Sequence, residues 1–387
     1  MTKKLAIVTT HPIQYYAPWF RLLAEQPNIE VKVFYTWSQT KEGFIDRTFG
    51  EKIVWDIPLL DGYEYEFVDN VSKEPGSHHK NGIICPDLIE KISLWNPDTI
   101  LVFGWYLKSH FEVMRYFKNK REIWFRGDSN LLDDLNFVKK LLRKIWLTYV
   151  YKFVDKVLYV GENNKNYYLE YGLKENQLIF APHAIDNRRF ESSKNLNYDE
   201  EAIEWRKELG LFEEDLVVLF VGKFEPKKNP ELLISAVQEF NLKAEKEIKL
   251  VLIGSGPLES QLKHLASEDE NILFLPFQNQ SKMPIVYRLG DILCLPSQGP
   301  GETWGLVVNE AMASSRGAIV SDKVGSACDL VENGLTGYVF KSNEGISLIQ
   351  VLNQLTKTNC KEMGLRAHEK IDTYSFNYIV EAIKNSI

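Results

Sequence analysis

The sequence contains few of the features that mark a secreted or zinc-stabilised protein. Its four cysteines are far apart along the 387 residues, with no Cys-x-x-Cys pair and no His-Cys spacing typical of a zinc site. We therefore expect reduced thiols, a cytoplasmic location and no structural zinc. No segment approaches the ~18 consecutive apolar residues that a membrane-spanning helix requires. The apolar run after Lys4 is also shorter than the core of a signal peptide.

Basic residues are fewer than acidic residues. The 46 Lys and Arg residues are outnumbered by 53 Asp and Glu residues, and the resulting net charge of −7 argues against a general nucleic-acid-binding protein. There is no internal repeat and no low-complexity tract. A hydrophobic content of 44% and a charged content of 26% are typical of globular proteins, and the length suits two domains of ordinary size.

Short apolar runs alternate with segments of helical periodicity, which predicts a mostly parallel sheet with helices on both faces. In the first half of the chain the expected strands are 5–8, 31–35, 99–103, 122–125, 156–160 and 177–180. The polar stretch 187–200 interrupts this pattern, and a second alternating series begins at Leu216. We therefore predict two Rossmann-like α/β domains, 1–186 and 187–371.

The most informative motif occupies residues 296–313, with Pro-Ser first, Glu-Thr-Trp-Gly-Leu from Glu302, and Asn-Glu-Ala-Met-Ala from residue 309. It predicts a loop that leads directly into a helix, whose unpaired N–H groups can bind a diphosphate. These donors are expected at Thr303, Trp304, Gly305, Leu306 and Val307. Glu302 could accept hydrogen bonds from sugar hydroxyls and Glu310 from a ribose. Two glutamates at this spacing also fit the solvated face of a helix.

A second motif follows the expected strand 216–221. It places Gly222 and Lys223 in a turn and Lys228 five residues later, before a helix expected at 231–240. Two ammonium groups at a leaving diphosphate would neutralise developing charge, each contributing up to about 4 kcal/mol at 4 Å with an effective dielectric of 20. Taken alone, the same residues fit a solvated basic turn.

These segments together resemble the signature of the retaining glycosyltransferases of family 4, most strongly between about residues 215 and 340. The resemblance implies the GT-B fold, in which two Rossmann-like doubly wound domains face each other across a cleft. It implies that the final helix, about 372–387, packs on the first domain. It also implies that Lys223, Lys228 and Glu302 act in catalysis. The nucleotide pocket would include Gly222, Gly254, Gly256 and Phe277.

The implied reaction moves a hexose-like sugar from a nucleoside diphosphate sugar to an acceptor hydroxyl. A UDP-sugar is favoured and a GDP-sugar comes next, with a role in bacterial surface polysaccharide or glycolipid assembly. No Asp-x-Asp motif lies in a suitable turn, so we expect a metal-independent enzyme without a cofactor. Two alternatives stay open: a GT-B nucleotide-sugar epimerase, and a non-catalytic nucleotide-sugar-binding partner of a transferase. A dehydrogenase would need Gly-x-Gly-x-x-Gly after the first strand, which this sequence lacks.

The first domain departs from the family pattern. His11 and Gln14 follow the first strand, where family members often have glycines, so these side chains are candidates for acceptor contact at the sheet edge that binds ligands. The alternative for His11 is packing within its loop. After the strand 122–125 the family often has a His, whereas this chain has Arg126 and Asp128. Either they supply the missing catalytic contacts or Asp128 caps a turn.

Residues 135–153 follow helical spacing, with apolar residues on one side and Lys139, Lys140, Arg143 and Lys144 on the other. The first interpretation is a core helix with a solvated basic face. The second is a surface helix that binds an anionic membrane, which would place the protein at the inner face of the cytoplasmic membrane.

Overall fold

A computed structural model describes residues 2–37, 44–45, 52–53, 56–133, 136–192 and 196–387. The chain divides into two compact units. The first contains most of the chain up to Pro182 together with Phe376–Ile387, and the main part of the second is His183–Ser375. The predicted domain boundaries at 186/187 and 371/372 stay a prediction. The polar stretch 187–200, expected between the domains, lies within the second unit and contains the 3₁₀ turn η4 (Asn187–Phe190) and the start of α6 (Tyr198–Glu208).

The first unit is built on a seven-stranded sheet in the order β5-β2-β1-β6-β7-β8-β9. Every neighbouring pair in it is parallel. Its strands are β1 (Lys3–Thr9), β2 (Ile29–Tyr35), β5 (Glu64–Phe67), β6 (Thr99–Phe103), β7 (Glu122–Arg126), β8 (Lys156–Tyr159) and β9 (Leu178–Phe180). The central strand β6 is buried along its whole length, as expected for a strand covered on both faces. A separate pair joins β3 (Phe44–Ile45) to β4 (Lys52–Ile53).

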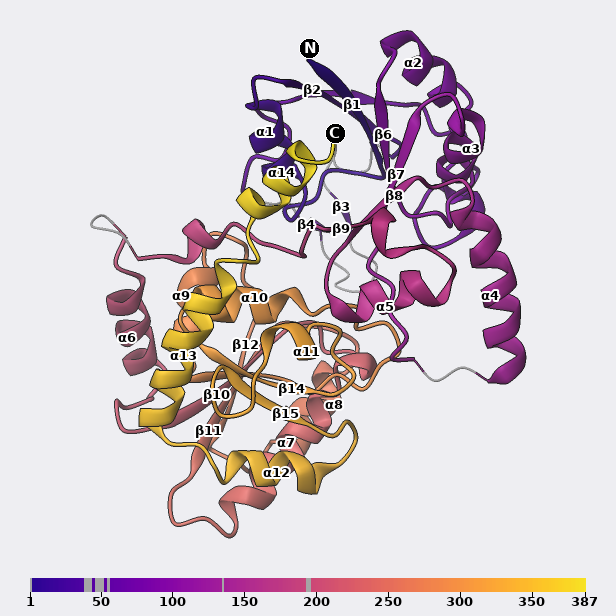
Figure 1. Ribbon diagram of the computed structural model, residues 1–387. Helices are drawn as coiled ribbons and strands as arrows, with labels where there is room; N and C mark the ends of the chain where they lie inside the picture. The colour runs from indigo at the N-terminus through magenta and orange to yellow at the C-terminus, as the bar shows by residue number, and fades with distance from the viewer. Residues whose placement is uncertain (1, 38–43, 46–51, 54–55, 134–135, 193–195) are drawn as a thin grey trace. The chain divides into compact units, whose positions relative to one another are not determined.

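Helices cover this sheet on two sides (Figure 1). They are α1 (Ala17–Ala24), α2 (Leu88–Trp95), α3 (Lys108–Phe117), α4 (Phe137–Tyr151), α5 (Glu162–Glu170) and α14 (Phe376–Lys384). The last helix, α14, packs against α1, and Lys156 of β8 donates to the carbonyl of Ser386 at 2.8 Å. The C-terminal segment is thus a structural part of the first unit.

The second unit contains a six-stranded sheet in the order β12-β11-β10-β13-β14-β15, again parallel throughout. Its strands are β10 (Leu216–Val221), β11 (Ile248–Ile253), β12 (Ile272–Leu275), β13 (Ile292–Leu295), β14 (Gly317–Ser321) and β15 (Gly337–Phe340). Its other helices are α7 (Pro230–Asn241), α8 (Glu259–Leu265), α9 (Met283–Leu289), α10 (Leu306–Ala313), α11 (Ala327–Leu330), α12 (Gly345–Leu352) and α13 (Lys357–Ile371). Helix α7 packs with α8 and α12, whereas α6 packs on α9 and α10 on α13.

The predicted α/β architecture is confirmed. All six strands expected in the first half are present as β1, β2, β6, β7, β8 and β9, and the alternating series after Leu216 forms the second sheet. Strand β5, at the edge of the first sheet, was not predicted. Its Glu-Tyr-Glu-Phe sequence is half polar, because an edge strand packs on only one neighbour and leaves much of its surface in solvent.

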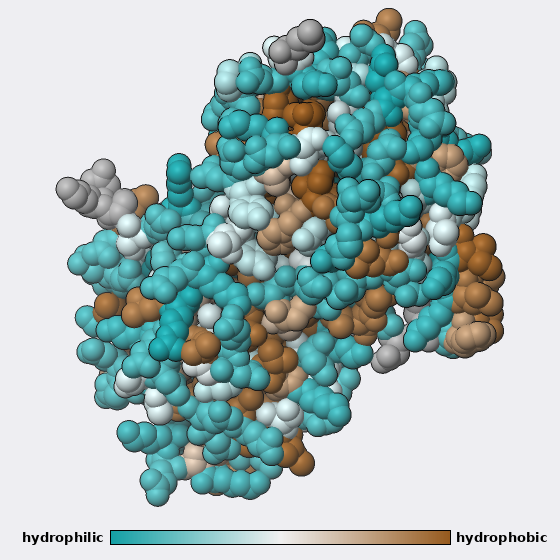
Figure 2. Space-filling model, viewed as in Figure 1, coloured by the Kyte–Doolittle hydropathy of each residue, from teal (hydrophilic) through white to brown (hydrophobic). Residues whose placement is uncertain are grey.

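The expectation that α4 is a core helix is wrong for its first half. Every residue from Asn136 to Trp146 is exposed, including Phe137 at 79% and Ile145 at 63%. Only the last turns enter the core of the unit, through Leu147, Val150 and Tyr151. Figure 2 shows the resulting gathering of hydrophobic residues over α4. Helical periodicity indicated an apolar side correctly. In the first half of α4 that side is exposed, and Trp146 makes ring contacts with Trp105 and Phe111.

Candidate functional site

The residues predicted to bind the donor follow β10, β11 and β13 in the second unit. These strands are neighbours in the sheet, so the turns at their carboxyl ends meet at one edge. Gly254, after β11, shows how closely two of these turns approach. A Cβ on Gly254 would lie 2.0 Å from the carbonyl oxygen of Gly222, and its φ of +149° also favours glycine. The glycines therefore allow the turns after β10 and β11 to pack closely together.

An ion pair joins the two motifs. Lys228 Nζ lies 2.6 Å from Glu302 Oε2, and both side chains are largely buried, at 13% and 7% exposure. Ser297 Oγ donates to the same carboxylate oxygen at 2.9 Å. The sequence placed Lys228 and Glu302 at one site, and the structure adds that they contact each other directly. This contact keeps a carboxylate and an ammonium group together at the edge of the sheet.

Backbone contacts hold this pair in place. The backbone N–H of Gln298 donates to the carbonyl of Lys227 at 2.9 Å. The side-chain amide of Gln298 donates to the carbonyl of Pro226 at 2.6 Å. The loop after β13 is therefore attached to the 3₁₀ turn η5 (Pro226–Lys228), which presents Lys228. Behind it, Ser321 at the end of β14 donates to the carbonyl of Ser297. Neighbouring strand ends thus fix the positions of the ion pair.

Helix α10 begins at Leu306, so Thr303 and Trp304 lie in the loop before it rather than in its first turn. Gly305 precedes the helix with a φ of +92°, and a Cβ there would lie 2.8 Å from Leu295 Cδ2. Glycine thus permits the sharp entry into the helix. The N–H groups of Leu306 and Val307 occupy the first turn, where backbone donors have no partner within the helix. The five N–H groups predicted for the anion site are therefore divided between this turn and the loop before it.

The loop before α10 is held by contacts that the sequence analysis had not predicted. The buried indole of Trp304 donates to Asn309 Oδ1 at 2.8 Å, and Asn309 donates to the carbonyl of His183 at 3.0 Å. The carbonyls of Glu302 and Trp304 accept from the N–H groups of Gly325 and Ser326. Trp304 therefore has a structural role in addition to its predicted place at the donor.

Glu310 is only 2% exposed, and its Oε2 accepts a hydrogen bond of 2.6 Å from the hydroxyl of Tyr287 on α9. This partner was not predicted, because nothing in the spacing of Tyr287 connects it to α10. The contact fixes one carboxylate oxygen of Glu310. Its role toward a ribose stays a prediction.

The other predicted donor residues lie on the same side of the sheet. Lys223 is half-buried in the turn after β10, and Phe277, 36% exposed, follows β12. Gly256 packs closely on the same turn, since a Cβ there would lie 2.6 Å from the carbonyl of Phe224. The predicted donor residues of the second unit are therefore brought to the carboxyl ends of its strands.

In the first unit, His11 and Gln14 follow β1 as predicted. The His11 ring meets Trp37 edge-on, with centroids 5.4 Å apart, and its Nδ1 lies 3.0 Å from Thr10 Oγ1. Burial lowers the pKa of His11 to about 4, so the ring is neutral at physiological pH. Gln14 is 9% exposed. A neutral His11 can accept or donate a hydrogen bond, and acceptor contact by both residues stays a prediction.

Arg126 and Asp128 follow β7 in the same unit. Arg126 is 2% exposed and donates to the carbonyls of Ala181 at 2.7 Å and Pro182 at 3.0 Å. Burial lowers the pKa of this guanidinium. Burial, and next the charge of Asp128, raise the pKa of Tyr16 to about 12, while Arg126 acts in the opposite direction. Arg126 therefore anchors the segment after β9. The catalytic contact predicted for Arg126 and Asp128 stays a prediction.

Comparison with known proteins finds a family model that matches most of the second unit. Residues 201–371, which include the Lys228 and Glu302 motifs, match the family model described as glycosyl transferases group 1. Residues 201–371 of this chain are thus similar to the group 1 glycosyl transferases.

Two curated relatives match parts of this chain. A D-inositol 3-phosphate glycosyltransferase of Nocardia farcinica is 32% identical over 192 residues, which cover 47% of this chain and 42% of the relative. An uncharacterized glycosyltransferase of Methanocaldococcus jannaschii is 30% identical over 153 residues, which cover 38% of each chain. The chain thus spans less than half the length of the curated relatives it matches.

Solved structures resemble the whole chain. Anabaena HepE, determined in complex with UDP, superposes with a TM-score of 0.72 at 16% identity and covers 100% of this chain and 99% of its own. Sucrose-phosphate synthase from Thermosynechococcus elongatus gives a TM-score of 0.71 at 15% identity, covering 99% and 98%. These similarities show the fold, and the two parallel Rossmann-like sheets are those of GT-B.

Proposed function

We propose that this chain transfers a sugar from a nucleoside diphosphate sugar to an acceptor hydroxyl, with retention at the anomeric carbon and with UDP as the favoured nucleotide. The Lys228–Glu302 ion pair at the entrance of α10 carries the proposal. The family match supports sugar transfer, and the solved complex of HepE with UDP supports the choice of nucleotide. The pathway that we favour is the assembly of a bacterial surface polysaccharide or glycolipid.

Lys228 would stabilise the leaving diphosphate. As the glycosidic bond breaks, negative charge grows on the phosphate oxygens, and the ammonium groups of Lys223 and Lys228 together with the first-turn N–H groups of α10 offset it. Glu302, held by Lys228 and Ser297, would keep its second oxygen for sugar hydroxyls. These groups supply positive charge without a metal, so we propose metal-independent transfer. Within the described ranges no cluster of three or more His, Cys, Asp or Glu side chains could hold a metal ion.

The contacts of Glu302 and Glu310 do not suit a glycosidase. A hydrolase needs one carboxyl group as a protonated acid and a second as nucleophile or base across the scissile bond. Here Glu302 is paired with an ammonium group and Glu310 accepts from a tyrosine hydroxyl. Both glutamates are thus engaged in positioning, which favours donor binding.

The proposal is tested by incubating the purified chain with UDP-sugars and measuring release of UDP. We expect slow donor hydrolysis without an acceptor and release of a product with the donor's anomeric configuration, read by proton NMR. Loss of UDP release in Lys228→Ala assigns the reaction to this site. Conversion of the donor into its epimer without UDP release would favour the epimerase instead. Binding of UDP without any turnover of donor or acceptor would favour a non-catalytic partner.

We also propose that α4 docks this chain on an anionic membrane surface. Seven large apolar side chains of this helix are exposed: Phe137, Val138, Leu141, Leu142, Ile145, Trp146 and Tyr149. Four exposed cations lie among them, and α4 contains no acidic residue. One of the four, Lys144, pairs with Glu170 of α5 at 2.8 Å. Apolar side chains can enter the acyl boundary while each cation contributes about 1 kcal/mol at an anionic leaflet. No described helix is long and apolar enough to span a bilayer, so α4 would lie in the membrane surface.

Vesicle flotation tests this docking. With phosphatidylglycerol vesicles, replacement of the four α4 cations by Ser should weaken binding by roughly several hundredfold, since four contributions of about 1 kcal/mol are lost. Replacement of Phe137, Leu141 and Ile145 by Ser should also release the protein. Lys243→Ser with Lys263→Ser is the matched control, because those lysines pair with Glu239 and Glu259 on the second unit. Equal flotation of all variants would refute the docking.

A further inference from the structure

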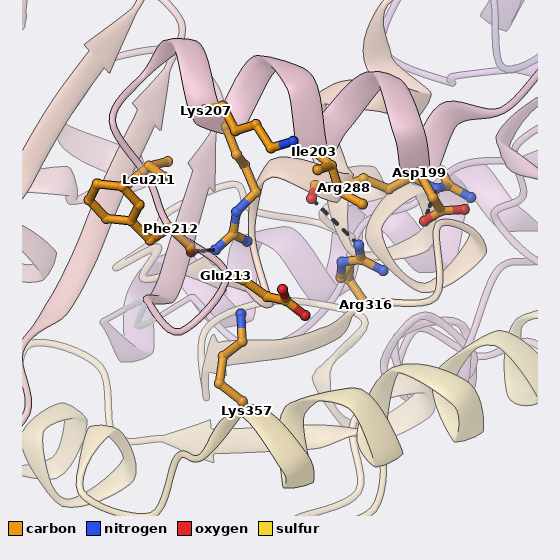
Figure 3. A pocket seen from close by; sticks show the side chains of 10 residues that line it. Asp199, Ile203, Lys207, Leu211, Phe212, Glu213, Arg288, Arg316 and Lys357 are labelled. Carbon is orange, nitrogen blue, oxygen red and sulfur yellow. Dashed lines mark hydrogen bonds and ion pairs between the residues drawn. The ribbon is translucent and has the colours of Figure 1, made fainter.

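The second unit contains a pocket that the proposed transfer does not use. It has a volume of about 400 Å³ and lies between α6, the segment 211–213 and the start of α13 (Figure 3). This volume is within the range of pockets that hold small molecules. Nothing in the donor motifs of the sequence pointed to it.

The pocket lies at the opposite edge of the sheet from the Lys228–Glu302 pair. Arg316, which lines it, immediately precedes β14, whereas the donor loops follow β10 and β13. Arg316 Nε donates to the carbonyl of Gly290, two residues before β13 begins. A six-residue strand such as β10 is about 20 Å long. A ligand in this pocket would therefore be separate from the donor.

Positive charge predominates in the lining. Five lining residues are cationic: Arg206, Lys207, Arg288, Arg316 and Lys357. Only two are acidic, and one of these, Asp199, is engaged by Arg288 at 3.1 Å. Positive charges still outnumber negative charges when Asp291, which lies outside the lining, is counted. It lies 3.7 Å from Arg206 and 2.8 Å from Lys357.

Arg316 contributes a charge that no carboxylate contacts. Within the described ranges its guanidinium donates only to backbone carbonyls, at 2.7 Å to Gly290, 3.2 Å to Ser314, 3.1 Å to Ser315 and 3.5 Å to Arg288. Burial, and next the charge of Arg288, lower the pKa of Arg316 to about 10, which leaves it charged at neutral pH. These carbonyls fix the guanidinium in place, so an anion would meet a preorganised positive charge.

Two charged side chains at the pocket are uncommitted. Lys207 and Glu213 are exposed, and neither forms an ion pair or side-chain hydrogen bond with any residue that the structure describes. Figure 3 shows Lys207 and Lys357 on opposite sides of the pocket, with Glu213 and Arg316 between them. The remaining wall is apolar, from Ile203, Leu211 and Phe212. The pocket thus combines surplus cations with an apolar surface.

We propose that this pocket binds a small phosphorylated molecule with an apolar or planar body. The phosphate would be placed among Lys207, Arg316 and Lys357, and the body would lie against the apolar wall. A phosphomonoester carries nearly two negative charges at neutral pH and would offset the cationic excess. Glu213 opposes an anion in this position, so its removal should strengthen binding while removal of Lys207 should weaken it.

Calorimetric titration of the full chain with phenyl phosphate and with inorganic phosphate, at fixed ionic strength and with UDP saturating, tests the proposal. Saturable binding of both is expected, with phenyl phosphate the tighter because its ring can cover Leu211 and Phe212. Lys207→Gln should weaken phenyl phosphate by about fivefold or more, and Glu213→Gln should strengthen it by a similar factor. The opposite signs are the specific signature of this pocket.

The control is Lys243→Gln, on the same unit but away from the pocket, which should bind phenyl phosphate as the unsubstituted chain does. Absence of saturable binding, or equal affinity in the Lys207 and Glu213 variants, would overturn the proposal. Binding of phenyl phosphate that occurs without UDP but is lost at saturating UDP would also overturn it, because the ligand would then occupy the donor site. Lys228→Ala should retain phenyl phosphate binding, and Lys207→Gln should retain sugar transfer, so the two proposals fail independently.

Discussion

The carboxyl edges of the two sheets differ in how their polar residues are arranged. In the second unit, Lys228, Glu302 and Ser297 contact one another and form a charged cluster from two short sequence motifs. In the first unit, His11 is held neutral by burial, and Arg126 is bound to the carbonyls of its own unit. One edge is thus organised around paired charges, which suit a charged diphosphate. The other is organised around desolvated groups, which suit a neutral hydroxyl acceptor.

The largest effect is expected from a substitution in the charged cluster of the second unit. Lys228→Ala should lower turnover by roughly 10²–10³, the loss typical when one charge-stabilising donor is removed. Lys227→Ala is the matched control, because Lys227 pairs at 3.6 Å with Glu225 rather than with Glu302. Steady-state kinetics with a UDP-sugar measures both variants, and thermal denaturation checks that Lys228→Ala still folds. Similar rates for the two variants would remove Lys228 from the mechanism.

Substitution of one glycine in each unit by alanine tests how closely the turns at the strand ends pack. Gly254→Ala should reduce the free energy of unfolding by about 3 kcal/mol or more, because its Cβ would overlap the carbonyl of Gly222. Gly104, after β6 in the first unit, also has a positive φ of +73°, but nothing lies within 4 Å of its Cβ position. Gly104→Ala should therefore cost only about 1 kcal/mol, from backbone strain. Chemical denaturation compares them, and equal losses would contradict the close approach.

The buried histidines of the first unit should make its stability depend on pH. Burial lowers the pKa of His11 and of His110 from 6.5 to about 4. The unfolded chain therefore binds more protons between pH 6.5 and 4, and stability falls as pH decreases through this range. Each histidine can contribute up to about 3 kcal/mol to this fall. His11→Gln should flatten the curve of melting temperature against pH; an unchanged slope would show that His11 is solvated.

The smallest effect is expected at the hydrogen bond between Tyr287 and Glu310. Tyr287→Phe removes the hydroxyl that donates to Glu310 and should cost about 1–3 kcal/mol of stability, because a buried carboxylate loses a partner. If Glu310 also binds the ribose, the affinity for UDP should fall severalfold. Tyr35→Phe, which removes a buried hydroxyl bond in the first unit, is the control and should leave UDP affinity unchanged. Calorimetry with UDP distinguishes the two variants.

The strands and the charged edge were predictable because their signals are local. The apolar run of β10 ends at a glycine turn, and the Lys228 and Glu302 motifs each occupy one turn and the residues beside it. The hydrogen bond from Tyr287 to Glu310 was not predictable, because it joins residues 23 positions apart on two helices with no shared motif. Strand β5 was missed because the prediction relied on continuous apolar runs, whereas β5 alternates polar and aromatic residues over only four positions.

The two series of parallel strands, the glycine turns and the charged residues beside them can be read from the amino-acid sequence. Each of these follows from backbone preferences and hydrophobic periodicity within a few residues. The fold was needed to show that Phe137 and its neighbours on α4 lie in solvent, that Lys228 contacts Glu302, and that Lys207 and Arg316 line one pocket. Burial and charge pairing depend on which distant segments the fold brings together, and that information is spread over the whole chain.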